Sequence, residues 1–118
     1  MGKQYDKEHA VTIVATAAIY ACRFVGFDGA HATSAGGAHD AQGISESGAD
    51  AGQAVSLITG YSGVVEAGEA FAQFAFVKAD ANGKAITGSA TDYCGRALEA
   101  SSGEGAFVEC VPLPVRHT

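Results

Sequence analysis

Residues 74–83 read FAFVKADANG, and this segment decides the fold class. Its first part places aromatic and β-branched residues in a short run, which is typical of a β-strand with one buried face. Its last part, Asp-Ala-Asn-Gly, holds residues that tolerate a positive φ, as a tight turn between antiparallel strands requires. Residues 23–29 read RFVGFDG and repeat the signal of a strand followed by an Asp-Gly turn.

These two segments are related by a constant shift of 52 positions. At this register residues 24–58 and 76–110 share eight identities in 35 positions. Matches of Ala and Gly can arise from composition alone, and a coincidence of composition stays open as the alternative. The identities with more weight are Phe24/Phe76, Val25/Val77, Asp28/Asp80 and Asp40/Asp92. The repeat predicts similar halves that bury Phe24 and Phe76 at equivalent places and align Val55 with Phe107.

Short strand-like runs separated by Gly-rich turns continue through both halves, and no long apolar stripe has the helical period. We therefore expect an all-β fold, a small β-barrel or sandwich built from two similar halves with an extended N-terminal arm. We expect one domain over residues 1–118. It comprises an arm or strand at 1–14, a first β half at 15–58 and a second β half at 67–110.

The composition points to a protein that gains stability from partner subunits. The chain of 118 residues contains 24 Ala and 16 Gly but only six Phe and no Trp. A chain of this size buries roughly 60–70% of its unfolded surface, and small side chains lower the apolar area further. We therefore expect a homo-oligomer.

Charge and hydropathy exclude two kinds of partner. The net charge is −6 and the seven basic residues are scattered, so a nucleic-acid partner is disfavoured. The apolar run at 10–22 has 13 residues, fewer than the roughly 20 that a membrane span needs, so no membrane partner is expected. The polar start MGKQYDKEH shows no secretory signal, which predicts synthesis in a reducing cytoplasm.

The three cysteines offer no recognisable site. Their odd number and the lack of a CxxC spacing argue against a disulfide scaffold and a cysteine zinc site. If the last hairpin is centred on residue 102, Cys94 and Cys110 face each other across paired strands. Whether they pair stays open at this point, because buried cysteine is often just a small apolar residue.

The histidines and paired aspartates are better explained by loops than by chemistry. His31 and His39 lie near Asp28 and Asp40, but their spacing matches no metal-ligand pattern. The repeated pair Asp40/Asp92 fits polar turn residues that bind their own backbone. We therefore expect no catalytic residue, no cofactor, no metal and no enzymatic activity.

The sequence resembles a known family over roughly residues 5–111. Residues 95–100, GRALEA, and residues 105–111, GAFVECV, resemble the C-terminal signature of small phage head decoration proteins, also called capsid cement or head fibre proteins. Residues 24–29 and 78–85 are also similar to that family. The residues at Tyr20, Cys22 and Cys94 have no match in its pattern.

The resemblance implies a structural virion protein without catalytic residues. Such proteins bind the outer surface of an icosahedral phage capsid and cement neighbouring subunits of the major capsid protein, commonly as trimers. The implied location is the capsid exterior.

The N-terminal segment supplies the candidate capsid contacts, Tyr5, Val11, Ile13 and Val14. Residues 1–9 have little to bury in an isolated subunit apart from Tyr5. Val11, Ile13 and Val14 could add a strand to a capsid partner through backbone hydrogen bonds. The alternative is that Val11–Val14 forms the first strand of the subunit's own sheet.

Two other functions stay open from the sequence. One is a small ligand-binding β-barrel or an enzyme without a recognisable motif, which would need convergent polar groups in a pocket. The other is a pilus-like or surface-layer subunit, which would need export.

Overall fold

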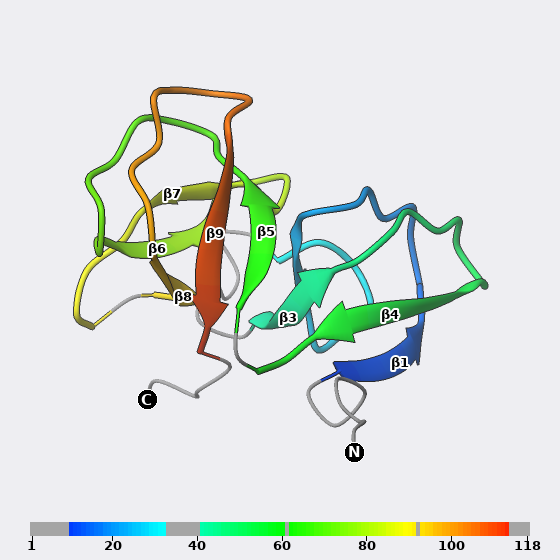
Figure 1. Cartoon of the computed structure of the whole chain (residues 1–118). Helices are drawn as coiled ribbons and strands as arrows, with labels where there is room; N and C mark the ends of the chain where they lie inside the picture. Colours follow the sequence, from blue (N-terminus) through cyan, green and yellow to red (C-terminus); the bar gives the residue numbers. More distant parts are fainter. Residues whose placement is uncertain (1–9, 33–40, 61, 92, 114–118) are drawn as a thin grey trace, which may run out of the picture.

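The computed structural model describes residues 10–32, 41–60, 62–91 and 93–113, and all regular elements in these ranges are β-strands (Figure 1). The first sheet has the order β1-β4-β3-β2 and the second the order β5-β9-β8-β6-β7. The bounds in the first sheet are β1 Ala10–Val14, β2 Phe24–Gly26, β3 Ala41–Ser45 and β4 Ala54–Ile58. Those in the second are β5 Gly63–Glu66, β6 Phe76–Ala79, β7 Ala85–Thr87, β8 Gly95–Ala97 and β9 Phe107–Pro112. The predicted all-β fold class is confirmed.

The two sheets share one connectivity, in which β5, β9, β8 and β6 take the places of β1, β4, β3 and β2. The shift of 52 seen in the sequence relates the pair Phe24↔Ile44 to the pair Phe76↔Arg96. It also relates two isolated bridges, Ile19↔Ala49 and Phe71↔Ser101. The division into halves at 15–58 and 67–110 stays a prediction as to its bounds.

The shift that relates the two sheets changes by one residue before β9, the last strand along the chain. Val14 pairs with Ala54 in the first sheet, and Glu66 pairs with Phe107 in the second, so the shift there is 53. The connection from β8 to β9 holds this extra residue. The predicted equivalence of Val55 and Phe107 is therefore wrong by one position, because the buried Val55 corresponds to the buried Val108.

Glycine recurs at equivalent positions because the backbone of the neighbouring strand comes close. A Cβ atom on Gly43 would lie 2.5 Å from the carbonyl oxygen of Ile58. A Cβ atom on Gly95 would lie 2.6 Å from the carbonyl oxygen of Val111, the counterpart of Ile58. No other residue fits such an approach without moving a strand.

The repeated Asp28 and Asp80 stabilise the turns that follow β2 and β6. Asp28 Oδ1 accepts a hydrogen bond from the backbone N–H of Ala30 at 3.1 Å. Asp80 Oδ1 accepts two, from Asn82 at 2.7 Å and Lys84 at 3.0 Å. Both carboxylates therefore act as turn residues, as the sequence suggested. Asp40 and Asp92 lie outside the described residues.

The core is shared unequally between the two sheets. A small cluster containing Ile19, Val25 and Leu57 lies on one face of the first sheet. The main cluster joins Phe24 and Ile44, on the other face of that sheet, to the interior of the second half. Figure 1 shows the sheets side by side, with β3 and β5 near their junction.

The structure corrects two expectations about single residues. Phe24 is fully buried, whereas Phe76 is only partly buried, so the prediction that both are core residues is wrong for Phe76. The last hairpin pairs Cys110 with Ala97 rather than with Cys94. All three cysteines are described, and none of them forms a disulfide.

Candidate functional site

The first candidate surface is the free edge of β1. β1 pairs with β4 on one side, and no strand among the described residues pairs with its other side. Val11 and Val14 are 42% and 61% exposed, while Ile13 packs partly against the small cluster. The segment is thus a strand of the subunit's own first sheet, the alternative to a free arm. Its outer edge still presents backbone hydrogen-bonding groups and apolar side chains.

Three of the four predicted contact residues therefore lie together on β1, while Tyr5 lies outside the described residues. Exposed apolar surface continues next to β1, because the turn at Asp28 and Gly29 packs against its end. The Thr16 N–H donates to the carbonyl oxygen of Gly29 at 3.0 Å. Phe27, beside this turn, is 60% exposed.

A second candidate surface, which the sequence did not reveal, lies on the outer face of the second sheet. We call its four residues the Arg96 cluster: Phe74, Phe76, Tyr93 and Arg96. Arg96 Nε donates to the carbonyl oxygen of Phe74 at 2.8 Å, and its guanidinium carbon lies 4.3 Å from the centre of the Phe76 ring. The centres of the Phe76 and Tyr93 rings are 5.0 Å apart. The sequence did not reveal this cluster, because the shift of 52 aligned Phe76 with Phe24 and predicted that both rings are buried.

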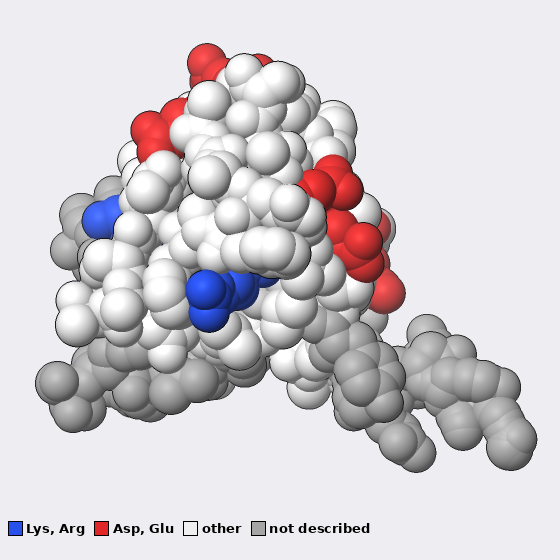
Figure 2. Space-filling view, turned by 60° about the vertical axis from the view of Figure 1, so that its left-hand side comes forward, with Lys and Arg blue, Asp and Glu red and all other residues white. Residues whose placement is uncertain are grey.

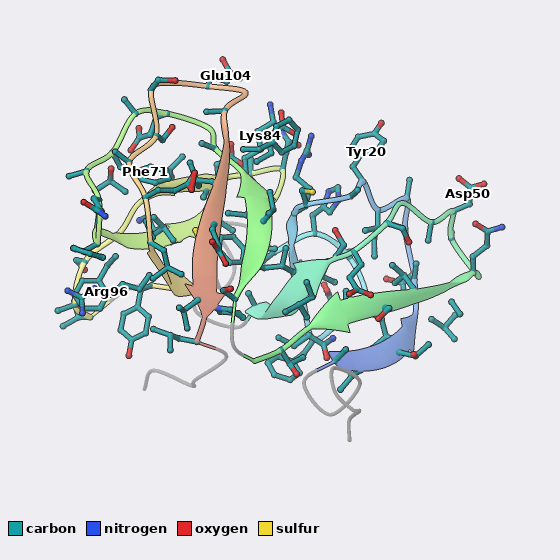
Figure 3. The ribbon with its side chains drawn as sticks, viewed as in Figure 1. Tyr20, Asp50, Phe71, Lys84, Arg96 and Glu104 are labelled. Atoms are coloured by element: carbon teal, nitrogen blue, oxygen red, sulfur yellow. The ribbon has the colours of Figure 1, made fainter. Side chains whose placement is uncertain are left out.

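The two candidate surfaces lie at opposite ends of the molecule. Arg96 is at the left in Figure 3, and β1 lies at the lower right in the same view. Figure 2 brings the left-hand side forward and shows basic atoms within a largely uncharged surface, with acidic side chains towards its margins. A protein with separate surfaces at its two ends can hold two different partners at once.

Between these ends, a charged contact joins the two sheets. Arg23 Nε and Nη2 donate to Glu66 Oε1 at 3.2 and 3.0 Å, and Nη1 donates to the carbonyl oxygen of Asn82 at 3.0 Å. Lys84 Nζ lies 3.7 Å from Glu66 Oε2. Arg23 precedes β2 and Glu66 ends β5, so this contact fixes the first sheet against the second.

Tyr20 and His31 lie beside this contact on the surface of the first half. The guanidinium carbon of Arg23 lies 5.2 Å from the centre of the Tyr20 ring. His31 Nε2 accepts a hydrogen bond from the Tyr20 N–H at 3.0 Å. Burial, and then the charge of Arg23, lower the pKa of His31. A neutral imidazole that accepts a backbone hydrogen bond has a structural role here.

An open hollow of about 410 Å³ between the sheets tests the ligand-binding alternative. Its lining includes Cys22, Glu46, Ser62 and Glu109. Ser62 donates a short hydrogen bond to Glu109, so these two polar groups satisfy each other. Burial and the charge of Glu66 raise the pKa of Cys22, which is the opposite of what an activated thiol nucleophile needs. The hollow therefore supplies no convergent reactive groups.

The described residues hold no group of three or more His, Cys, Asp or Glu side chains that could bind a metal ion. Of the residues considered for a metal site, His31 and Asp28 bind backbone groups instead, and His39 and Asp40 lie outside the described ranges. Within the described part of the chain, no helix is long and apolar enough to cross a membrane.

Comparison with known proteins gives a consistent result. The family model described as phage cement protein matches residues 4–112. Among solved structures, the N base of head fiber gp8.5 in bacteriophage phi29 matches with a TM-score of 0.70 and 18% identity, over 91% of this chain and 95% of that chain. At that identity the likeness establishes the fold. No curated protein matches the sequence.

Proposed function

The chain belongs to the phage cement protein family, and from this premise we propose that it clamps neighbouring subunits of the major capsid protein on the outer surface of the phage head. The family makes it a non-enzymatic structural protein of the virion that binds the capsid. The partner within the shell, a homotrimeric state and synthesis in the host cytoplasm belong to the proposal.

The observation that carries the proposal is the open edge of β1. An edge strand can extend its sheet with a strand of another protein, where backbone hydrogen bonds give affinity and side chains give specificity. Val11 and Val14 are large apolar residues exposed on this strand, where an edge that avoids contact would carry charge or proline. Tyr5 precedes β1 and is the fourth proposed contact.

Self-association is supported by the composition and by the division of the surface. A chain with 24 Ala and 16 Gly has few large side chains with which to build a core, so contacts between copies add stability. With capsid contact at the β1 end, the far end is left for contact between copies.

Cosedimentation with purified expanded heads tests the role of β1. We expect wild-type protein to sediment with heads and the double variant Val11→Lys, Val14→Lys to bind at least about tenfold more weakly, since lysine on an edge strand opposes strand addition. Val64→Lys is the matched control, because Val64 is 45% exposed on β5, the equivalent edge strand of the second sheet.

Circular dichroism and thermal unfolding show whether each variant stays folded. Loss of head binding in a folded double variant, with binding kept by Val64→Lys, supports the proposal. Unchanged binding by the folded double variant excludes β1 as the contact, and wild-type protein that fails to sediment with heads contradicts capsid attachment.

A further inference from the structure

The Arg96 cluster occupies a face whose counterpart in the first sheet is already covered. Phe24 and Ile44, the counterparts of Phe76 and Arg96, are both 0% exposed. They belong to the main cluster, together with Val65 and Cys110 of the second half. The outer face of the first sheet is thus buried by another unit of the same architecture.

The contact inside the subunit shows how such a face is covered. Gly63 on β5 lies against the first sheet, and a Cβ atom built there would be 3.0 Å from Ile58 Cδ1 and 3.5 Å from Ile44 Cδ1. A sheet edge of one half therefore packs onto the outer face of the other. Among the described residues, no further unit of this architecture covers the second sheet in the same way.

The residues on the uncovered face are those that protein interfaces favour. Aromatic side chains and arginine are enriched in the energetically dominant part of such contacts. Phe74 is 56% exposed, and Arg96 is exposed with its guanidinium held against the Phe76 ring. This preorganisation lowers the entropy that Arg96 loses when a partner binds.

Phe74 has a backbone conformation that suits glycine better than phenylalanine. Its φ is 67°, in the left-handed region, and its counterpart Cys22 has a φ of 63°. The turn before β2 and β6 thus imposes this conformation in both halves. A bulky residue is disfavoured there, and an exposed Phe gains little from burial in the isolated subunit.

We propose that the Arg96 cluster is the self-association face of this protein and that a second copy of the chain covers it. This inference rests on the proposed function and locates the contact between copies. The covered face of the first sheet shows that a unit of this architecture can pack on such a surface.

Sedimentation velocity on the full chain tests this proposal. Protein concentrations from about 1 µM to about 100 µM separate stable from weak self-association. We expect wild-type protein to be an oligomer and both Phe74→Gly and Arg96→Glu to be monomers. Tyr20→Gly is the matched control, because Tyr20 is also an exposed aromatic, at 62%, and belongs to the first half. It should remain an oligomer.

Thermal unfolding separates an interface role from a folding role. Glycine relieves the backbone strain at residue 74, so monomeric Phe74→Gly should keep its circular dichroism spectrum and unfold cooperatively. Arg96→Glu is the second variant, should the first fail to fold. A monomeric wild type, or variants that associate as wild type does, would overturn the proposal.

Head cosedimentation distinguishes this proposal from capsid attachment. If the Arg96 cluster joins copies, monomeric variants still bind heads, though more weakly because avidity is lost. If folded variants keep the wild-type oligomeric state but lose head binding, the face contacts the capsid and self-association through it is wrong. Failure of wild-type protein to bind heads contradicts the proposed function alone.

Discussion

The outer faces of the two sheets share strand order and pairing but differ in the burial of their side chains. Phe24 and Ile44 on the first sheet are fully buried against the second half. Phe76 and Arg96 take the same places on the second sheet, where Phe76 is partly buried and Arg96 is exposed. Strand order and pairing are repeated, but burial is not, because the two halves contact each other through different surfaces. The first sheet contributes its outer face, and the second sheet contributes its β5 edge at Gly63.

The largest expected effect comes from truncating the two equivalent phenylalanines. Phe24→Ala should lower the free energy of unfolding by about 3–5 kcal/mol, the cost of removing a fully buried ring. In protein dilute enough to be monomeric, Phe76→Ala should cost only about 1–2 kcal/mol, from partial burial and the lost Arg96 contact. Urea unfolding of both variants measures the difference. Equal losses would mean that the two faces are equally covered.

A smaller effect is expected at the charged contact that holds the sheets together. Arg23→Met should lower the free energy of unfolding by about 2–3 kcal/mol, because it removes hydrogen bonds to a partly buried carboxylate. Glu104→Gln is the control, since its side chain is 73% exposed beside Lys84 and surface pairs contribute about 0–1 kcal/mol. Guanidinium screens ion pairs, so urea is the denaturant to use. A loss in Arg23→Met no larger than in the control would show that apolar packing alone sets the sheet arrangement.

The smallest losses of stability are expected at two equivalent glycines, and they should be equal in the two halves. Gly52 and Gly105 occupy equivalent turns with φ of 89° and 90°, and no other atom lies within 4 Å of a Cβ atom built at either residue. Changing either one to Ala should cost about 1–2 kcal/mol through backbone strain alone. Thermal unfolding of the two single variants gives the comparison. Costs that differ by more than about 1 kcal/mol would show that the turns are not equivalent.

Local chemistry in the sequence predicted the turns and part of the repeat. Asp28 and Asp80 were expected in turns, and both bind the backbone N–H groups of those turns. The shift of 52 correctly aligned Phe24 with Phe76, because both strands follow the same local pattern. The shift of 52 is wrong at Phe107, because the loop before β9 contains one added residue. That loop is rich in Gly and Ser, so its sequence does not show where the added residue lies.

The two candidate surfaces differ in how far the sequence alone could predict them. The strand at β1 was expected, and its exposed Val11 and Val14 are visible in the sequence as an apolar run near the N-terminus. Whether this strand was free or paired depended on β4, which lies far along the chain and pairs with β1 in the register Ala10↔Ile58 to Val14↔Ala54. The Arg96 cluster assembles Phe74, Phe76, Tyr93 and Arg96 from two strands and the segments before them, and alternation along one strand does not say which face is covered.

The sequence by itself determined an all-β chain with two related sets of strands, since alternation, turn residues and glycines act over a few neighbouring positions. Only the tertiary structure decided which of two equivalent faces is core and which is surface. Burial depends on what packs against a strand from elsewhere in the chain. The second half covers Phe24, and nothing in the described part of the chain covers Phe74 and Arg96 in the same way.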